Sequence, residues 1–194
     1  METTKIISGA TDDEIWQQIN DDLLGEEDIL NYNVIIQQNG KQIIMDIDID
    51  PGGGFEGGYA ITSFTAHIHN DSDFHFKMHD ENFIDEIGEF FGLGHLKTND
   101  PDFDKKVFVK TDNDDKARAV LSNQASKNFF KSLSNYSLAI VKDDENHQVQ
   151  YSLELSIDEG ITNPSDLRNI YTHFYTILTK IDEQARAKTF SVQP

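Results

Sequence analysis

The sequence predicts an α+β fold: an antiparallel sheet built from hairpins, with helices packed on one face. Three observations lead to this prediction. Several segments alternate apolar and polar residues with a period of two, these segments come in pairs around turn residues, and segments with a helical apolar stripe lie between the pairs. Because such strands carry one polar face, we expect the polar face of the sheet to lie on the side away from the helices.

The first expected element is a helix that begins at a capping box. Thr11 and Glu14 form the T-x-x-E pattern, in which both side chains bond backbone N–H groups of the first turn. Four apolar residues then share one helical face, namely Ile15, Trp16, Ile19 and Leu23. Gly25 ends the pattern. We interpret residues 1–28 as an N-terminal helical segment of a single domain spanning 1–194.

The clearest hairpin runs from Leu30 to Asp50 around Asn39-Gly40, a dipeptide that favours a type I′ turn. Pairing Gln38 with Lys41 brings apolar residues opposite one another: Ile36 with Ile43, Val34 with Met45, Tyr32 with Ile47, and Leu30 with Ile49. Polar residues meet on the other face, Asn33 with Asp46 and Asn31 with Asp48. A slip of one residue would mix the two faces, so the pattern specifies this register.

The stretch DIDIDPGGGFEGG, which starts at Asp46, raises the question of a cation-binding loop. Same-face carboxylates of one strand lie about 6.5–7 Å apart, too far to share an ion without a bend. An EF-hand counted from Asp46 requires Gly and Glu where this chain has Pro51 and Gly57. We therefore interpret Asp46, Asp48 and Asp50 as the polar face of a strand that runs into a glycine-rich connection.

Residues 59–80 predict a second hairpin, and each of its strands places two histidines on its polar face. An H-x-H pair facing a histidine of the neighbouring strand is a pattern that binds zinc or nickel. The candidate metal ligands are His67, His69, His75 and His79. The alternative is an ordinary polar sheet face, because Lys77 would stand among the ligands and repel a cation. A divalent metal is the one cofactor that the sequence suggests.

The C-terminal half continues with short strands and helices. A helical apolar stripe is expected over 83–91, a strand over 107–109, a helix capped by Asp112 or Asn113, and a further helix capped by Ser122. A turn at Asp100, Asp102 and Asp104 is favoured over an acidic ion site. A third hairpin pairs 138–141 with 149–157.

The last expected element is a long helix that begins at Asn163-Pro164-Ser165. Its expected buried face consists of Leu167, Ile170, Tyr171, Phe174, Ile177, Leu178 and Ile181. His173 lies beside this stripe, where core packing is the ordinary role. Residues 188–194 are expected to form a frayed tail.

One block resembles a known pattern. Residues 102–121, DFDKKVFVKTDNDDKARAVL, resemble an uncharacterised bacterial protein family whose pattern is D-x-F-x-x-x-F-x-V, then a polar turn, then D-x-x-A-R-x-x-L, a helix and a terminal hairpin. The matching residues are Phe103, Val109, Asp115, Ala117, Arg118 and Leu121. The chain departs at Val107 and Phe108, where the aromatic residue is displaced by one position. The resemblance reaches from Phe76 to Ile181. It implies a fold and no catalytic residue, and some relatives carry membrane spans.

Composition narrows the classes of function. The chain of 194 residues has 35 acidic and 16 basic residues, a formal net charge of −19 and no cysteine. That charge disfavours nucleic acid and anionic lipid as partners and favours a basic protein or a divalent cation. The lack of cysteine excludes disulfides and thiolate chemistry. Without a long apolar run or a secretion signal, we expect no membrane segment and a cytoplasmic protein.

Three classes of function follow. The leading hypothesis is a non-enzymatic acidic protein that binds another protein, in the manner of an immunity protein or an antitoxin, with dimerisation left open. The alternative is a metal-binding protein or metal-dependent enzyme that uses the four histidines. A third is a ligand pocket between the sheet and the Phe-rich segments 83–91 and 129–130. No G-x-S-x-G motif supports serine hydrolase chemistry.

Overall fold

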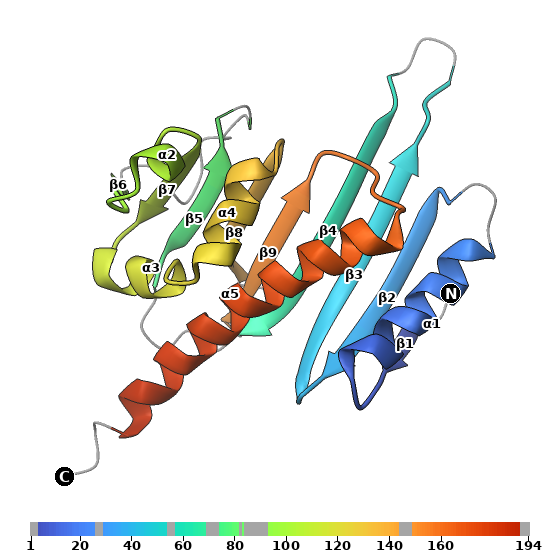
Figure 1. Ribbon diagram of the computed structural model, residues 1–194, viewed down its shortest axis with the longest axis horizontal. Helices are drawn as coiled ribbons and strands as arrows, with labels where there is room; N and C mark the ends of the chain where they lie inside the picture. Colours follow the sequence, from blue (N-terminus) through green and yellow to red (C-terminus); the bar gives the residue numbers. More distant parts are fainter. Residues whose placement is uncertain are drawn as a thin grey trace. The chain divides into compact units, whose positions relative to one another are not determined.

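The computed structural model describes residues 4–25, 29–53, 57–68, 74–81, 83, 93–143 and 149–190, the last five of these by backbone alone. Its nine described strands are mostly antiparallel and are combined with helices, which confirms the predicted α+β class (Figure 1). The chain folds into two compact units. Unit 1 combines Met1–Ala66 with Ser156–Thr172, and unit 2 combines His67–Leu155 with His173–Pro194.

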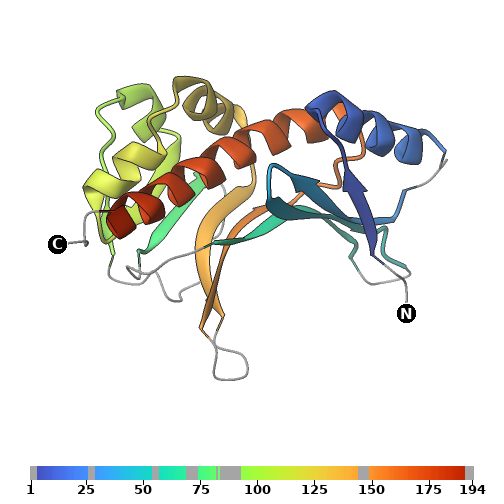
Figure 2. The same ribbon diagram turned by 90° about the horizontal axis from the view of Figure 1, so that it is seen from below.

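Unit 1 contains four strands of the nine-stranded sheet, in the order β1-β2-β3-β4. Its elements are β1 (Lys5–Ser8), α1 (Asp12–Leu24), β2 (Asn31–Gln38), β3 (Lys41–Asp50), β4 (Tyr59–Ile68) and the first part of α5 (Pro164–Phe190). β1 runs parallel to β2, and the other two pairs are antiparallel. Figure 2 shows α1 and the first turns of α5 on the same side of this sheet. We call that side closed and the opposite side open.

The capping box predicted for α1 is present. Thr11 Oγ1 accepts a hydrogen bond from Glu14 N at 3.2 Å, and Glu14 Oε2 accepts one from Ala10 N at 2.7 Å. All four predicted apolar residues of this helix are buried, and Gly25 is its C-cap. The acidic first turn lies at the positive end of the helix dipole, which stabilises the helix start further.

The β2–β3 hairpin has the predicted register. Gln38 pairs with Lys41, Val34 with Met45, and Asn33 with Asp46. Asn39 and Gly40 have φ angles of 50° and 75°, the positive values that a type I′ turn requires. Agreement between turn chemistry and the alternation of both strands leaves one register that buries the apolar face.

After β3, Gly52 and Gly58 occupy backbone positions that favour or require glycine. Gly52 has a φ angle of 73°, and its N–H donates to Asp50 Oδ1 at 2.8 Å. A Cβ atom on Gly58 would lie 2.3 Å from the backbone oxygen of Asp50, which only glycine avoids. The close approach of these two backbones requires glycine at position 58.

The closed side of unit 1 holds its core. Trp16 of α1 meets Tyr171 of α5 edge to face at 5.5 Å between ring centroids, and Tyr171 OH donates to Gln38 Oε1 at 2.8 Å. Thr62 Oγ1 of β4 donates to Glu159 O at 2.8 Å and accepts from Ile161 N at 2.9 Å. These contacts hold both helices against one face of the sheet.

Unit 2 contains five strands in the order β9-β8-β5-β7-β6. Its elements are β5 (Phe76–Asp80), β6 (Gly94–His95), α2 (Pro101–Asp104), β7 (Val107–Thr111), α3 (Asp114–Val120), α4 (Gln124–Ser132), β8 (Tyr136–Asp143), β9 (Gln150–Ile157) and the later part of α5. β8 and β9 are neighbours, which confirms the third predicted hairpin.

The second predicted hairpin, over residues 59–80, is wrong. β5 pairs with β7 on one edge, where Met78 lies opposite Val109, and with β8 on the other, where Met78 lies opposite Leu138. β4 pairs with β3 instead. The physical reason is that β5 is buried along its whole length, and a strand buried on both faces is stable between two neighbours. Turn residues at 70–73 indicate a chain reversal but do not specify the partner strand.

Two predicted helices of unit 2, α3 and α4, are present, the second with a shifted start. Asn113 caps α3, as one of the two predicted alternatives, and its Oδ1 accepts from Lys116 N at 3.1 Å. Asn123, and not Ser122, caps α4, because the N–H of Ser122 still closes the end of α3 on Ala119 O. Except for Phe83, the helix expected over 83–91 lies outside the described residues.

The long C-terminal helix agrees with its predicted start and buried face. Asn163 Oδ1 accepts from Ser165 N at 2.9 Å and from Asp166 N at 3.3 Å, as an N-cap does. Each of the seven residues predicted for its buried stripe is buried. The helix continues to Phe190, beyond the expected start of the frayed tail.

Candidate functional site

The open side of unit 1 carries a row of isoleucines across three strands. The registers place Ile6 of β1 beside Ile35 of β2, and Ile35 beside Ile44 of β3. We call these three residues the isoleucine row. Ile6 is 58% exposed and Ile44 is 36% exposed, although the opposite side of the same strands holds a complete core. Adjacent exposed apolar side chains of this kind are typical of a binding surface.

Three carboxylates continue from this row along β3. Asp46, Asp48 and Asp50, here called the acidic column, occupy every second position and therefore share the open side. Asp46 Oδ1 accepts from Asn33 Nδ2 at 2.7 Å, and Asp48 Oδ2 accepts from Tyr59 OH at 2.9 Å. Both donors are neutral, so the bonds orient the carboxylates and leave their charge in place. The interpretation of this stretch as a strand face is confirmed.

The open side of these strands has no lysine or arginine, a statement that covers the whole of β1 to β4, and its one histidine is His67 near the end of β4. Their two lysines point the other way, because Lys5 pairs with Val34 and Lys41 pairs with Gln38, both on the closed side. Lys5 Nζ forms an ion pair with Asp22 of α1. The acidic column therefore gives the open side a formal charge of −3.

Apolar side chains flank the acidic column on β4. Ile61 lies opposite Asp48, and Tyr59 lies opposite Asp50. The Tyr59 side chain is 49% exposed. Its pKa is raised, first by the hydrogen bond to Asp48 and then by the negative charge of that carboxylate. Tyr59 thus presents an aromatic face to solvent beside a fixed anion.

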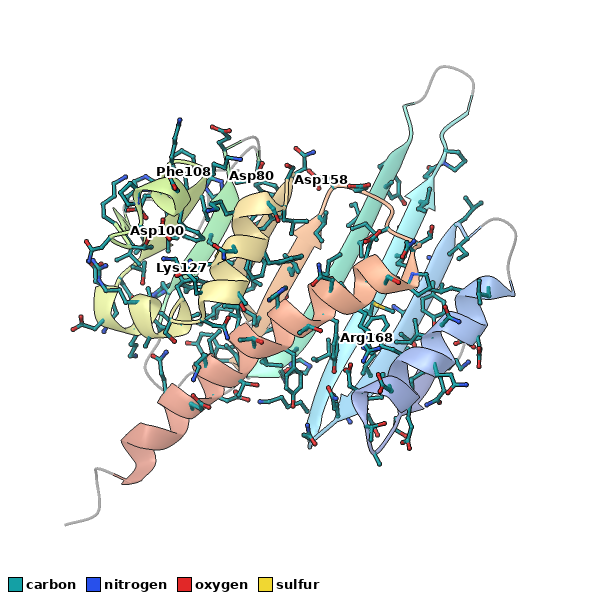
Figure 3. The ribbon with its side chains drawn as sticks, in the orientation of Figure 1. Asp80, Asp100, Phe108, Lys127, Asp158 and Arg168 are labelled. Carbon is teal, nitrogen blue, oxygen red and sulfur yellow. The ribbon has the colours of Figure 1, made fainter. Side chains whose placement is uncertain are left out.

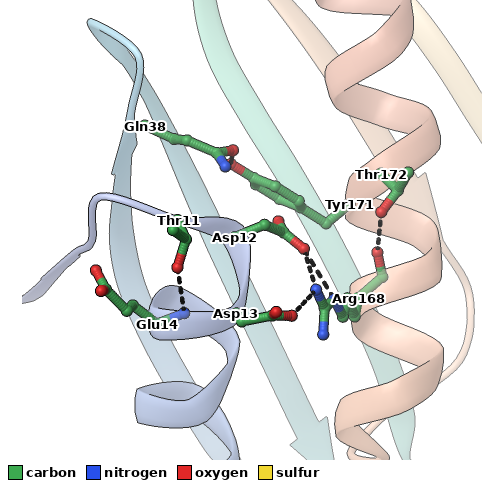
Figure 4. Close-up of polar contacts among 8 residues, drawn as sticks. All are labelled: Thr11, Asp12, Asp13, Glu14, Gln38, Arg168, Tyr171 and Thr172. Carbon is green, nitrogen blue, oxygen red and sulfur yellow. Dashed lines mark hydrogen bonds and ion pairs between the residues drawn. The ribbon is translucent and has the colours of Figure 1, made fainter.

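The acids at the start of α1 have a different role, shown in Figure 4. Arg168 of α5 donates through Nε to Asp12 Oδ2 at 2.9 Å and through Nη2 to Asp12 Oδ2 and to Asp13 Oδ1, the latter at 2.6 Å. The hydrogen bonds to Asp13 and Asp12 raise the pKa of Arg168. Asp12 and Asp13 are therefore satisfied within unit 1 and hold its two helices together.

The hairpin expected to bring the four predicted histidine ligands together is not formed, because β5 pairs with β7 and β8. His67 is exposed near the end of β4, and His69 lies outside the described residues. His75 bonds Asp112, its ring Nδ1 lying 3.0 Å from Oδ2. His79 is only 7% exposed, its Nδ1 lies 2.8 Å from Asp80 O, and its ring stacks on Phe108. Over the described parts of the chain, no three His, Asp or Glu residues are grouped to hold a metal ion.

The aspartates at 100, 102 and 104 belong to the short helix α2 and its cap. Asp100 accepts from Phe103 N at 3.1 Å and pairs with Lys127 Nζ at 3.1 Å, and Figure 3 shows both side chains. The bond from Phe103 N, followed by that from Lys127, lowers the pKa of Asp100. Asp104 accepts from Thr98 N and Oγ1. The preference for a turn over an ion site thus agrees with these contacts.

A serine and a histidine also meet in unit 2. Ser126 Oγ of α4 lies 3.1 Å from His173 Nδ1 of α5, and the Phe129 ring stacks on the imidazole at 4.4 Å. Burial lowers the pKa of His173. Because Ser126 is buried, this pair is a packing contact between two helices and offers no exposed nucleophile. Core packing was the expected role for His173.

Sequence reasoning identified the acidic column but missed the isoleucine row. The row extends beyond Ile35 and Ile44 only through Ile6 of β1, whose parallel pairing with β2 has no local sequence signal. In the described parts of the chain, no helix combines the length and the apolar character of a membrane span. Comparison of the chain with protein-family models, with characterised proteins and with solved structures found no match.

Proposed function

We propose that this protein is a non-enzymatic binding protein that holds a basic protein partner on the open side of unit 1. The supporting observation is the isoleucine row beside an acidic column on a face without a lysine or arginine. Apolar contact would supply affinity, and the carboxylates would select a cationic surface and steer its approach. The net charge of −19 adds long-range attraction for the same class of partner.

The area of this face limits the stability of the complex that it can form. Four strands cover roughly 19 Å by 25 Å, or about 500 Å². A stable interface buries about 800 Å² on each partner, so this face alone suits a weak or transient complex in which charge sets the association rate. A protein of the immunity or antitoxin type, whose carboxylates cover a basic surface of its target, is the narrower form of this proposal.

The test is a pull-down from a native cell extract with the tagged chain, washed at low and at raised salt. The variant Asp46→Asn/Asp48→Asn/Asp50→Asn removes the acidic column. A matched control, Asp21→Asn/Asp102→Asn/Asp158→Asn, removes three charges from exposed aspartates elsewhere. Exposed ion pairs contribute about 0.2–1 kcal/mol each, so the column variant should weaken binding by roughly threefold to 150-fold.

The expected result is a basic partner that the wild type and the control variant retain at low salt, that raised salt releases, and that the column variant loses. Two results would contradict the proposal. One is a complex that survives raised salt unchanged, because screening weakens contacts between exposed charges. The other is an equal loss in both triple variants, which would show that net charge and not this face carries the binding.

A further inference from the structure

We infer that the partner segment is an amphipathic helix that lies along β3, with cations at i, i+4 and i+8 over the acidic column and apolar residues in its next turn over the isoleucine row. This inference rests on the proposed function and specifies the partner for the same face. It follows from spacing, from backbone hydrogen bonding and from the side chains that border the column.

The spacing of the carboxylates matches one turn of a helix. Asp46, Asp48 and Asp50 occur at every second position of the strand, about 6.6 Å apart, and span about 13 Å. Helix positions four residues apart advance by about 6 Å, so cations at i, i+4 and i+8 span about 12 Å. Flexible lysine or arginine side chains accommodate the remaining difference.

The same helix would reach the apolar end of the face. Ile44 lies one further step of two residues beyond Asp46 on the same side of β3. A helix residue at i+12 therefore comes over Ile44, and i+11 or i+15 comes over Ile35 on the neighbouring strand. The predicted partner pattern is thus three cations at a spacing of four, followed within one turn by two apolar residues.

An extended partner segment fits less well because of its backbone. β3 pairs with β2 on one edge and with β4 on the other, so no further strand can pair with it. An extended chain lying flat on the sheet would leave its own N–H and C=O groups without protein partners. A helix satisfies these groups internally and presents only side chains. Its positive N-terminal end would also lie over the acidic column if the cations come first.

Tyr59 makes arginine the favoured cation at i+4. A guanidinium that reaches Asp48 would lie beside the exposed Tyr59 ring, whose OH already bonds that carboxylate at 2.9 Å. Planar guanidinium groups bond carboxylates at two points and stack on aromatic faces, which an ammonium group does less well. Tyr59→Phe should therefore keep most of the affinity, and Tyr59→Ala should lose about threefold to tenfold.

The experiment compares labelled peptides by fluorescence anisotropy at low salt. One peptide carries arginines at i, i+4 and i+8 and two leucines at i+11 and i+12. A second has the same composition with arginines at i, i+2 and i+4, the spacing of an extended segment. Binding of the first should be at least about tenfold tighter and should be accompanied by a gain of helical circular dichroism. Equal affinities, or tighter binding of the second peptide, would overturn the helical inference.

Two protein variants separate this inference from the proposed function. If the column variant loses both peptides equally and the wild type does not distinguish them, the basic-partner proposal stands and the helix fails. If neither peptide depends on the acidic column, the proposed function itself fails. Ile44→Asn should weaken only the first peptide, because only that peptide brings its leucines over the isoleucine row. The wild-type comparison remains decisive even where a variant folds poorly.

Discussion

The strands of the two units use the same sequence pattern in different ways. β3 alternates isoleucine with aspartate, and β5 alternates Phe76 and Met78 with Lys77 and His79. On β3 the polar residues lie on an accessible face, whereas Lys77 and His79 are only 9% and 7% exposed. Alternation therefore assigns residues to the two faces of a strand, and it does not tell which faces reach solvent.

The polar sides also differ in charge and in neighbours. In unit 1 the open side carries three carboxylates held by an amide and a phenol. In unit 2 Lys77 lies opposite Lys110 and close to the Phe83 ring, and His79 lies between Phe83 and Phe108. The polar side chains of β5 therefore contact aromatic rings inside unit 2, whereas the carboxylates of β3 lie on a face that a partner could reach.

The largest expected effect compares two adjacent residues of β2. Ile36 is fully buried on the closed side, so Ile36→Ala should lower the free energy of unfolding by about 2–5 kcal/mol. Ile35 is half-buried on the open side, and Ile35→Ala should lower it by about 1 kcal/mol or less. Urea unfolding measures both. Equal losses would show that the open side belongs to a core.

The next effect compares the polar positions of β3 and β5. His79→Ala removes a buried ring and its stacking on Phe108, and should destabilise the protein by about 1–3 kcal/mol. Asp48→Ala removes an accessible carboxylate and should change stability by no more than about 0.5 kcal/mol. Thermal unfolding at one pH tests the pair. A loss at Asp48 as large as that at His79 would remove the distinction between the polar positions of β3 and β5.

The hairpin of unit 1 could be predicted because the turn residues and the apolar–polar alternation of both strands indicate the same register. The Asn39-Gly40 turn specifies a two-residue connection, and both flanking strands alternate in phase, so the register follows. The stripe of α5 is likewise long enough to be read from periodicity alone. The acidic column was predictable for the same reason, because it is the polar half of that alternation.

The remainder depends on partners distant in the chain. β1 has four residues and a single buried side chain, Ile7, so no local pattern indicates that it pairs in parallel with β2. The turn residues between β4 and β5 predict a hairpin, whereas the burial of β5 on both faces favours its pairing with β7 and β8. Ile35 and Ile44 follow from the predicted β2–β3 register, so Ile6 of β1 is the part of the isoleucine row that could not be predicted.

A smaller effect concerns the acids that unit 1 uses internally. Arg168→Met keeps the apolar stem and removes the bonds to Asp12 and Asp13, and should lower stability by about 0.5–1 kcal/mol at low salt. The loss should shrink at raised salt because all three groups are partly exposed. Lys180→Met, which removes an i, i+3 pair with Glu183, is the control and should change less. A salt-independent loss would contradict the ionic role.

The smallest effect tests a partly buried histidine of unit 2. Burial against Ser126 and Phe129 lowers the pKa of His173, whereas the unfolded histidine has a pKa of about 6.5. As pH falls through that value, the unfolded chain binds the proton more readily, so stability that is present at neutral pH is lost on the acid side. His173→Gln should reduce the difference in stability between pH 7 and pH 5.5. An unchanged difference would mean that other groups set the acid response and that the partial burial of this imidazole does not contribute to it.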